Sequence, residues 1–162
     1  MSRSGPGRGS LVAVERFEAF CRETEPRLRR ALSAAYGPTV GVDAAGEAMV
    51  WACEHAEQVL RMENAPGYLY RVGQTAARRL RRPTGPLFAA GASAGPPDVE
   101  PRLLALLEGL TEPQRVCVVL VHAYQWTQQE VADLLDVEHA TVRTHLSRAL
   151  TKLRTALEVD CA

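Results

Sequence analysis

Arginines are the residues of this chain best suited to bind a charged ligand, and a first group of them lies in residues 61–82. That stretch holds six arginines against one acid, Glu63, and the next acid is Asp98. Four polar side chains recur there at helical spacing and would share one helix face: Arg71, Gln74, Arg78 and Arg82. A solvated helix face usually mixes both signs of charge for i,i+4 pairing, whereas this face carries no acid. The pattern therefore favours contact with phosphate or nucleic acid over a plain solvated face.

A second basic group lies near the C-terminus, where residues 138–162 hold four basic side chains against three acids. The stretch WTQQEVADLLDVEHATVRTHLSRALTKL, residues 126–153, is typical of two short helices joined by a tight turn. Thr127 and Glu130 have capping-box spacing, and Asp136 tolerates the left-handed backbone of such a turn. Apolar residues at three- and four-residue steps leave the second helix a polar outer side: His139, Arg143, Thr144, Ser147 and Arg148. The segment therefore predicts a helix-turn-helix that binds DNA, although the same motif also occurs as plain structure.

The sequence lacks the residue patterns that metal binding and enzyme catalysis usually need. The four cysteines form no CxxC pair, and Cys53 with His55 is too small a set to hold zinc. The sequence contains no Ser/His/Asp set, paired carboxylates, glycine-rich phosphate loop or HExxH motif. We therefore expect a protein that is not an enzyme, with no cofactor and no metal, whose thiols are reduced and structural.

Overall charge and hydropathy narrow the class of protein further. The formal net charge is zero, with 19 basic and 19 acidic residues, which does not favour a protein that coats nucleic acid along its whole surface. Because the basic groups are islands in an acidic chain, contact with DNA at two places fits better. No apolar run approaches the roughly 18 residues that span a bilayer, and no apolar segment follows the basic N-terminus, so a cytoplasmic location is expected.

Helices are the elements that must position these side chains. Ala and Leu runs dominate and alternation of β-branched residues is nearly absent, so the expected fold class is all-α. The stretch PTGPLFAAGASAGPPDVEP, residues 83–101, contains five of the ten prolines and three glycines, which predicts a flexible linker. It separates two small helical domains, residues 11–82 and 102–162, and residues 1–10 are expected to form a disordered arm. Because 19 extended residues reach about 60 Å, the two domains need not touch.

Capping residues indicate where individual helices begin. In the N-terminal domain, Pro26 is expected to start a second helical segment, and Asp43 is expected to cap the next helix. Asn64 is expected to cap the helix GYLYRVGQTAARRLRR. In the C-terminal domain, Thr111 is expected to open a capping box ahead of the apolar run VCVVLVHAY.

Taken together, the two halves resemble the extracytoplasmic-function (ECF) class of bacterial RNA polymerase sigma factors, over about residues 15–158. The stretch LTEPQRVCVVLVHAYQWTQQEVADLLDVEHATVRTHLSRALTKLR looks like region 4 of that family, and NAPGYLYRVGQTAARRLRR looks like the end of region 2. DAAGEAMVWACEHAE looks like the region 2 helix that docks on core polymerase. The high use of Ala, Gly and Arg suits an actinobacterial source.

This resemblance implies a subunit without catalytic activity that directs core RNA polymerase to promoters for transcription initiation. Region 2 would bind the clamp coiled coil of the β′ subunit and capture the −10 element. Region 4 would sit on the β flap and read the −35 element in the major groove, and the linker would thread through the polymerase channel. Core polymerase and promoter DNA are thus the implied partners, an anti-sigma factor is a further one, and no membrane contact is implied.

Site residues follow from the resemblance position by position. The polymerase-facing helix would present Asp43, Glu47 and Trp51. The −10 DNA would be faced by Arg71, Gln74, Thr75, Arg78, Arg79 and Arg82. The −35 helix would present His139, Thr141, Arg143, Thr144, His145 and Arg148.

The sequence departs from the family pattern at several places. DAAGE stands where Asp-Leu-Val-Gln-Glu is usual, which removes two apolar contacts, and Gly46 costs about 1 kcal/mol of helix stability. Thr75 and Arg79 occupy the positions of a common Asn and Asp, so an unusual −10 preference is expected. Glu138 replaces a Ser ahead of the recognition helix and is a poor N-cap. His145 stands where Arg is common, so part of its contact would depend on pH.

Two other functions stay open at this point. A stand-alone regulator would bind its operator through the helix-turn-helix without polymerase, and its N-terminal half would bind a protein or ligand. A degenerate sigma-like protein would bind polymerase or an anti-sigma factor without initiating transcription, and the DAAGE departure motivates this alternative.

Overall fold

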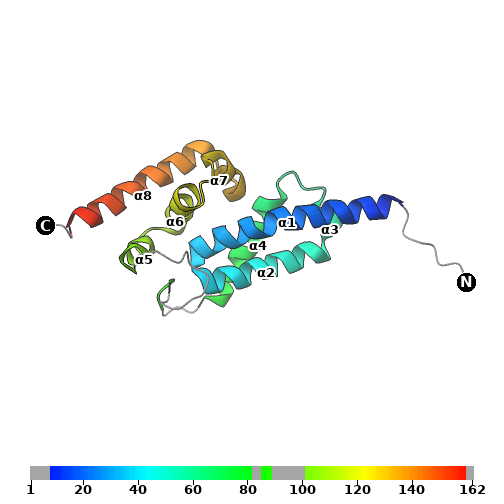
Figure 1. Ribbon diagram of the computed structural model, residues 1–162, viewed down its shortest axis with the longest axis horizontal. Helices are drawn as coiled ribbons and strands as arrows, with labels where there is room; N and C mark the ends of the chain where they lie inside the picture. The colour runs from blue at the N-terminus through cyan, green and yellow to red at the C-terminus, as the bar shows by residue number, and fades with distance from the viewer. Residues whose placement is uncertain (1–7, 82–84, 89–100, 160–162) are drawn as a thin grey trace, which may run out of the picture.

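The structure, a computed structural model, describes residues 8–81, 85–88 and 101–159 and consists of two groups of helices (Figure 1). The first group contains α1 (Arg8–Tyr36), α2 (Pro38–Glu54), α3 (Ala56–Val59) and α4 (Ala65–Leu80). The second group contains α5 (Pro101–Glu108), α6 (Glu112–Val118), a π-helical turn (Val119–Ala123), α7 (Gln128–Leu135) and α8 (His139–Val159). No strand occurs in the ranges described, and the expected all-α fold class is confirmed.

Helix α1 is the centre of the first group and runs without a break through Pro26. A segment boundary was expected at this proline, and that expectation was wrong. Proline disfavours a helix interior by about 3 kcal/mol because it lacks the N–H donor. Beyond it, Leu28 and Leu32 are fully buried on a helix that packs against α2, α4 and α6, and this packing outweighs the local penalty. The helix begins at Arg8, ahead of the expected domain boundary at residue 11.

The reversal from α1 to α2 depends on Gly37, whose φ of 86° lies in the left-handed region. A Cβ at this position would also collide with the carbonyl group of Leu87. Pro38 then begins α2, since its fixed φ suits the first helical position. The expectation that Asp43 caps this helix was therefore wrong, and Asp43 lies exposed inside α2.

Helix α4 begins as its sequence predicted. The side chain of Asn64 caps the helix by accepting a hydrogen bond from the Gly67 backbone N–H at 3.0 Å. Leu69 and Ala76 are buried on its inner face, whereas Leu80 at the last turn is partly exposed. The same Asn64 side chain donates from Nδ2 to the carbonyl oxygen of Asp133 in α7 at 2.7 Å. The cap of α4 is thus also a link to the second group.

The second group is organised around α6, which packs on α8. The predicted capping box at its start is confirmed: the Thr111 backbone N–H donates to Gln114 Oε1 at 3.3 Å. Val116, Val131 and Val142, from α6, α7 and α8, are fully buried together in the core of this group. These valines belong to the same hydrophobic cluster that includes Leu28 and Leu32 of the first group.

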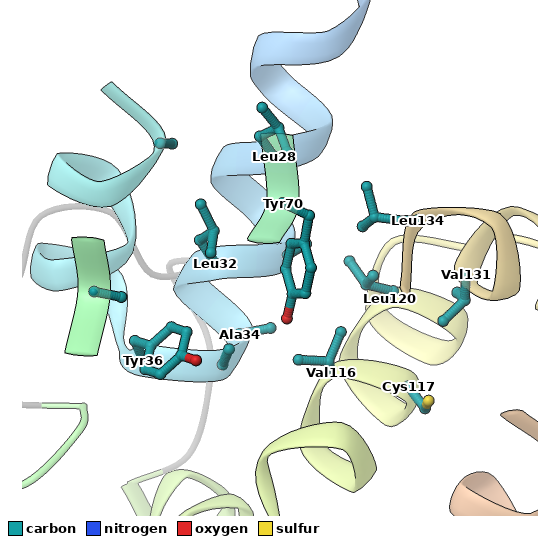
Figure 2. Close-up of a cluster of buried hydrophobic side chains, with 14 of the residues drawn as sticks. Leu28, Leu32, Ala34, Tyr36, Tyr70, Val116, Cys117, Leu120, Val131 and Leu134 are labelled. Atoms are coloured by element: carbon teal, nitrogen blue, oxygen red, sulfur yellow. The ribbon is translucent and has the colours of Figure 1, made fainter. Parts of the chain in front are cut away.

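The two groups are in direct contact, although the length of the linker did not require it. Figure 2 shows Leu28 and Tyr70 of the first group facing Val116, Leu120 and Leu134 of the second. All five side chains are at most 3% exposed. Contact is favoured because this apolar surface would otherwise face water.

Part of the expected linker also packs on the fold. Leu87 and Phe88 are half-buried, and the Phe88 backbone N–H donates to Glu108 Oε1 at 3.0 Å. Within the described part of the chain, every helix is too short or too polar to cross a lipid bilayer.

Candidate nucleic-acid interface

The turn between α7 and α8 has the geometry that its sequence predicted. Asp136 ends α7 in the left-handed conformation, with φ 54° and ψ 50°. The Val137 backbone N–H donates to the Ala132 carbonyl oxygen at 3.1 Å, which closes the end of α7. The chain can therefore reverse within three residues, so that α7 and α8 pack on each other as a helix-turn-helix.

The start of α7 is fixed by a reciprocal capping box. Thr127 Oγ1 accepts from the Glu130 backbone N–H at 3.2 Å, and Glu130 Oε2 accepts from the Thr127 backbone N–H at 2.8 Å. The Thr127 hydroxyl also donates to the same carboxylate at 2.9 Å. The hydrogen bonds that Glu130 accepts lower the pKa of its carboxyl group, and the bond from the Thr127 backbone N–H has a larger effect than the bond from the hydroxyl. The capping box thus holds the orientation of α7 beneath the recognition helix.

Helix α8 presents a polar outer face that agrees largely with the sequence. Four of the six residues assigned to −35 DNA are exposed: His139, Arg143, Thr144 and Arg148. A shallow hollow runs along this face and is lined partly by residues that the sequence assignment had left out: Gln128, Ala140 and Ser147. Of these, Gln128 carried a usable signal, because it is a polar residue in the first turn of α7, beside the recognition helix. An exposed face with these donors can contact phosphates and base edges.

Thr141 and His145, the other two assigned residues, lie half-buried at the margin of this face. His145 Nδ1 is enclosed and has no hydrogen-bond partner within the described residues. Burial, and secondly the charge of Arg148, lower the pKa of His145 below its usual 6.5. Both effects disfavour the charged imidazolium, so His145 is a weaker source of positive charge than an arginine would be at this position.

The residues assigned to −10 DNA divide between two sides of α4. Arg71 and Gln74 face the second helix group: Arg71 pairs with Asp136 at 2.7 Å, and Gln74 donates to Glu112 at 2.7 Å. Thr75 and Arg79 line a hollow between α4 and α2. The six assigned residues therefore do not act as one free surface in this structure.

The last two members of that set lie toward the C-terminal end of α4. Arg78 is exposed, and both Arg78 and Glu112 lie near the Tyr36 hydroxyl. Burial, followed by the neighbouring Glu112 carboxylate, raises the pKa of Tyr36 to about 12. Arg82 lies outside the described residues.

The hollow between α2 and α4 also contains two residues of the assigned polymerase-binding set. Glu47 forms an ion pair with Arg79, and the Trp51 ring stacks on His55 with ring centroids 4.1 Å apart. Val50, which the sequence assignment left out, lines the same hollow and is 59% exposed. Asp43, the third assigned residue, does not line it. An exposed valine between a carboxylate and a tryptophan is better suited to contact the surface of a protein than the phosphate backbone of a nucleic acid.

The DAAGE segment, residues 43–47, lies partly in the core of the protein and not wholly on the surface. Ala44 and Ala45, which stand where larger apolar residues are usual, are buried in the protein's own core at 0% and 1% exposure. They lie on the side of α2 that packs against α1 and α4, where a Cβ on nearby Gly41 would collide with the Ser33 backbone. Small residues here allow close helix packing. Of this segment, Gly46 and Glu47 line the hollow.

Arg115 is a polar centre that sequence reasoning missed. Its side chain is only 4% exposed and donates to four main-chain carbonyl oxygens: Ala34 at 2.9 Å, Ala35 at 2.5 Å, Leu107 at 3.3 Å and Leu110 at 2.9 Å. Burial is the largest effect on its pKa and lowers it. No sequence signal distinguished this arginine from a surface one. As for metals, the described residues contain no group of three His, Cys, Asp or Glu side chains that could hold an ion.

Comparison with known proteins agrees with this geometry. Residues 101–153 match the family described as "Sigma-70, region 4". The fold is similar to that of the sigma factor RpoE solved in complex with the anti-sigma factor NepR from Bartonella quintana, with a TM-score of 0.60 and 18% sequence identity. The similarity covers 90% of this chain and 99% of that one, and at this identity it shows a shared fold. No curated protein matches the sequence.

Proposed function

We propose that this protein is an ECF-type sigma factor that binds core RNA polymerase and directs it to specific promoters. The observation that carries the proposal is the exposed polar face of α8, which lies inside the segment that matches sigma-70 region 4. The fold similarity over 90% of the chain supports the assignment of the first helix group to region 2.

In this proposal α8 enters the major groove of the −35 element. Arg143 and Arg148 supply charged donors for base edges or phosphates, and Thr144 supplies a hydroxyl and a methyl group. The two capping boxes and the left-handed turn support this face from behind, so little ordering is needed when DNA binds. His139 lies at the helix N-terminus, where backbone N–H groups attract a phosphate.

The first helix group would bind the −10 element through α4 and the polymerase through α2. Arg71, Arg78 and Arg79 supply positive charge along α4, which attracts phosphates of the melted strand. The hollow with Glu47, Val50 and Trp51 offers apolar surface beside a carboxylate for the clamp coiled coil of the β′ subunit. The same hollow carries Thr75 and Arg79, so polymerase and DNA would meet at adjacent surfaces. An anti-sigma factor is a further proposed partner.

In vitro transcription with core polymerase from the source organism tests the proposal. Fragments of the source genome serve as templates, with and without the protein. Discrete new start sites that appear only with the protein would establish the function. Co-purification with polymerase but no start site would indicate a degenerate sigma-like protein. Operator binding without any polymerase binding would indicate a stand-alone regulator.

A further inference from the structure

Two of the cysteines lie on the hairpin that α1 and α2 form. Cys21 belongs to α1 and is half-buried, and Cys53 belongs to the last turn of α2 and is exposed. Cys117, in contrast, is fully buried in the core, and burial raises the pKa of its thiol to about 12. Among the residues described, Cys21 and Cys53 are therefore the thiols that a reagent in water can reach.

The register of the hairpin brings these two cysteines to the same level. Helices α1 and α2 are joined by Gly37 alone and run side by side in opposite directions (Figure 1). Gly41 lies directly against the backbone of Ser33, because a Cβ added to Gly41 would be 2.3 Å from the Ser33 Cα. Cys53 is twelve residues after Gly41, and Cys21 is twelve residues before Ser33. Since both helices rise by about 1.5 Å per residue, the two cysteines lie level with each other across the hairpin.

The two helices are packed closely along this hairpin because α2 presents small side chains to its neighbours. Ala45, Ala48 and Ala52 are at most 1% exposed, and Ala52 directly precedes Cys53. Side chains of this size let helix axes approach to about 8 Å, and each Cα lies about 2.3 Å from its axis. A disulfide needs Cα atoms about 4.4–6.8 Å apart, which residues on neighbouring faces of such helices can reach.

Electrostatics gives a second sign that the two thiols are neighbours. Burial raises the pKa of the Cys21 thiol, and the next largest cause is the charge of Cys53, ahead of Glu18 on the same helix. Interactions between groups in contact with water fade beyond about 10 Å. Cys53 therefore lies close to Cys21, as the register of the hairpin requires.

We infer that Cys21 and Cys53 form a reversible disulfide bond within one chain when the protein meets hydrogen peroxide. The bond ties α1 to α2 at the end of the hairpin that is remote from the Gly37 turn. The inference assigns a modification site to the first helix group and does not depend on the proposed function.

Exposure decides which thiol reacts first. Cys53 lines an open hollow at the end of α2, so peroxide can approach its sulfur. The Cys53 thiolate attacks one peroxide oxygen and the O–O bond breaks, which gives a sulfenic acid and a hydroxide that takes up the proton lost by Cys53. The Cys21 sulfur then attacks the sulfenic sulfur, and the S–S bond forms as the S–O bond breaks. The leaving hydroxide takes the Cys21 proton, so two thiols give up two electrons and one hydrogen peroxide becomes two water molecules.

Peptide mapping of the full wild-type chain tests the bond. The folded protein is treated with one equivalent of hydrogen peroxide, its remaining thiols are blocked with N-ethylmaleimide, and it is digested with trypsin without reductant. Trypsin releases Cys21 in residues 17–22 and Cys53 in residues 31–61, so the linked pair has a mass of its own. We expect this pair over a wide range of protein concentrations, because the bond lies within one chain, and its loss after dithiothreitol.

Single substitutions test the order of the two steps. In Cys21→Ser, Cys53 should stop at the sulfenic acid and be captured by dimedone, whereas in Cys53→Ser the Cys21 thiol should stay reduced. Cys161→Ser is the matched control, since it removes a thiol that has no part in the bond, and it should give the linked pair as wild type does. Absence of the linked pair from the folded wild type, or its appearance only in urea, would overturn the inference.

Urea unfolding of the oxidised and the reduced protein shows whether the bond fits the native packing. A link that closes a loop of about 30 residues restricts the unfolded chain, so oxidation should raise the midpoint of unfolding by between about 1 and about 2 M. Cys53→Ser should show no such shift after the same treatment. A midpoint that stays constant or falls on oxidation of the wild type would mean that the link strains the hairpin, and the inferred facing of the two thiols would be wrong. None of these measurements uses polymerase or DNA, so their outcome is separate from that of the transcription assay.

Discussion

Replacement of Arg115 by methionine probes the interface where its polar bonds are concentrated. Methionine has a similar length, fills the same space and carries no donor. The change removes the guanidinium from four carbonyl oxygens, those of Ala34, Ala35, Leu107 and Leu110. The Leu107 carbonyl keeps the Leu110 backbone N–H as a donor at 3.2 Å, so three acceptors are left without one. Loss of these bonds should destabilise the folded chain and weaken the contact between the two helix groups.

The size of the effect follows from the number of acceptors. A buried acceptor left without a donor costs about 1–3 kcal/mol, and at the lower end three of them amount to about 3 kcal/mol. This is a large share of the roughly 5–15 kcal/mol by which domains are stable. With a urea m-value of about 2 kcal/mol per molar, the midpoint of unfolding should fall by about 1.5 M.

Urea unfolding followed by circular dichroism at the helix band measures this change. Arg148→Met is the matched control, since it removes an exposed arginine from α8 and should alter stability by less than about 0.5 kcal/mol. If Arg115→Met lost less than about 1 kcal/mol, water would be replacing the guanidinium at little cost, and the reasoning on buried carbonyls would be refuted.

Three further predictions concern the DNA surfaces and acid stability. Arg143→Ala should weaken promoter use about tenfold or more in transcription assays, because a good base contact is worth about 1–3 kcal/mol. An equal loss of transcription on a template with a scrambled −35 element would contradict a role of Arg143 in −35 recognition. Arg78→Ala/Arg79→Ala should impair opening of the promoter strands, measured by permanganate footprinting, while α8 should still bind duplex DNA. If this variant and Arg143→Ala both transcribe like wild type, the assigned DNA-binding residues are wrong. Hydrogen bonds from Thr127 lower the pKa of Glu130, so their contribution to stability is present above the usual pKa of 4.5 and is lost as pH falls below it. Thr127→Ala removes the hydroxyl bond and keeps the backbone N–H bond, so the hydroxyl part of the stability difference from wild type should shrink between pH of about 6 and about 3. A difference that stays constant would argue against this linkage.

Local features of the fold could be predicted from the sequence because they depend on neighbours in the chain. Asn64, Thr111 and Thr127 cap helices that begin at the following residue, and Asp136 takes the left-handed conformation that its short polar side chain permits. The polar outer face of α8 followed from helical spacing of apolar residues, and most of it is exposed as expected.

Other helix boundaries depended on contacts that no local rule contains. Pro26 has the local chemistry of a helix start, yet α1 continues through it because Leu28 and Leu32 are buried beyond it. Asp43 has the chemistry of a cap, yet α2 begins earlier at Pro38 after the left-handed Gly37. In both cases distant packing or backbone geometry outweighed a side-chain preference worth only a few kcal/mol.

The order of residues was enough to say which side chains carry charge, which helices carry them and where the helix-turn-helix lies. The partner of each charged side chain depended on how the helices pack. Arg71 and Arg115 are both helical arginines, yet one forms an exposed pair with Asp136 and the other is buried among carbonyl groups. A helix repeat fixes the direction of a side chain relative to its own axis, whereas its partner depends on the surface that packs opposite. That surface comes from residues dozens of positions away, so the contact between the two helix groups was set by packing and could not be predicted from spacing.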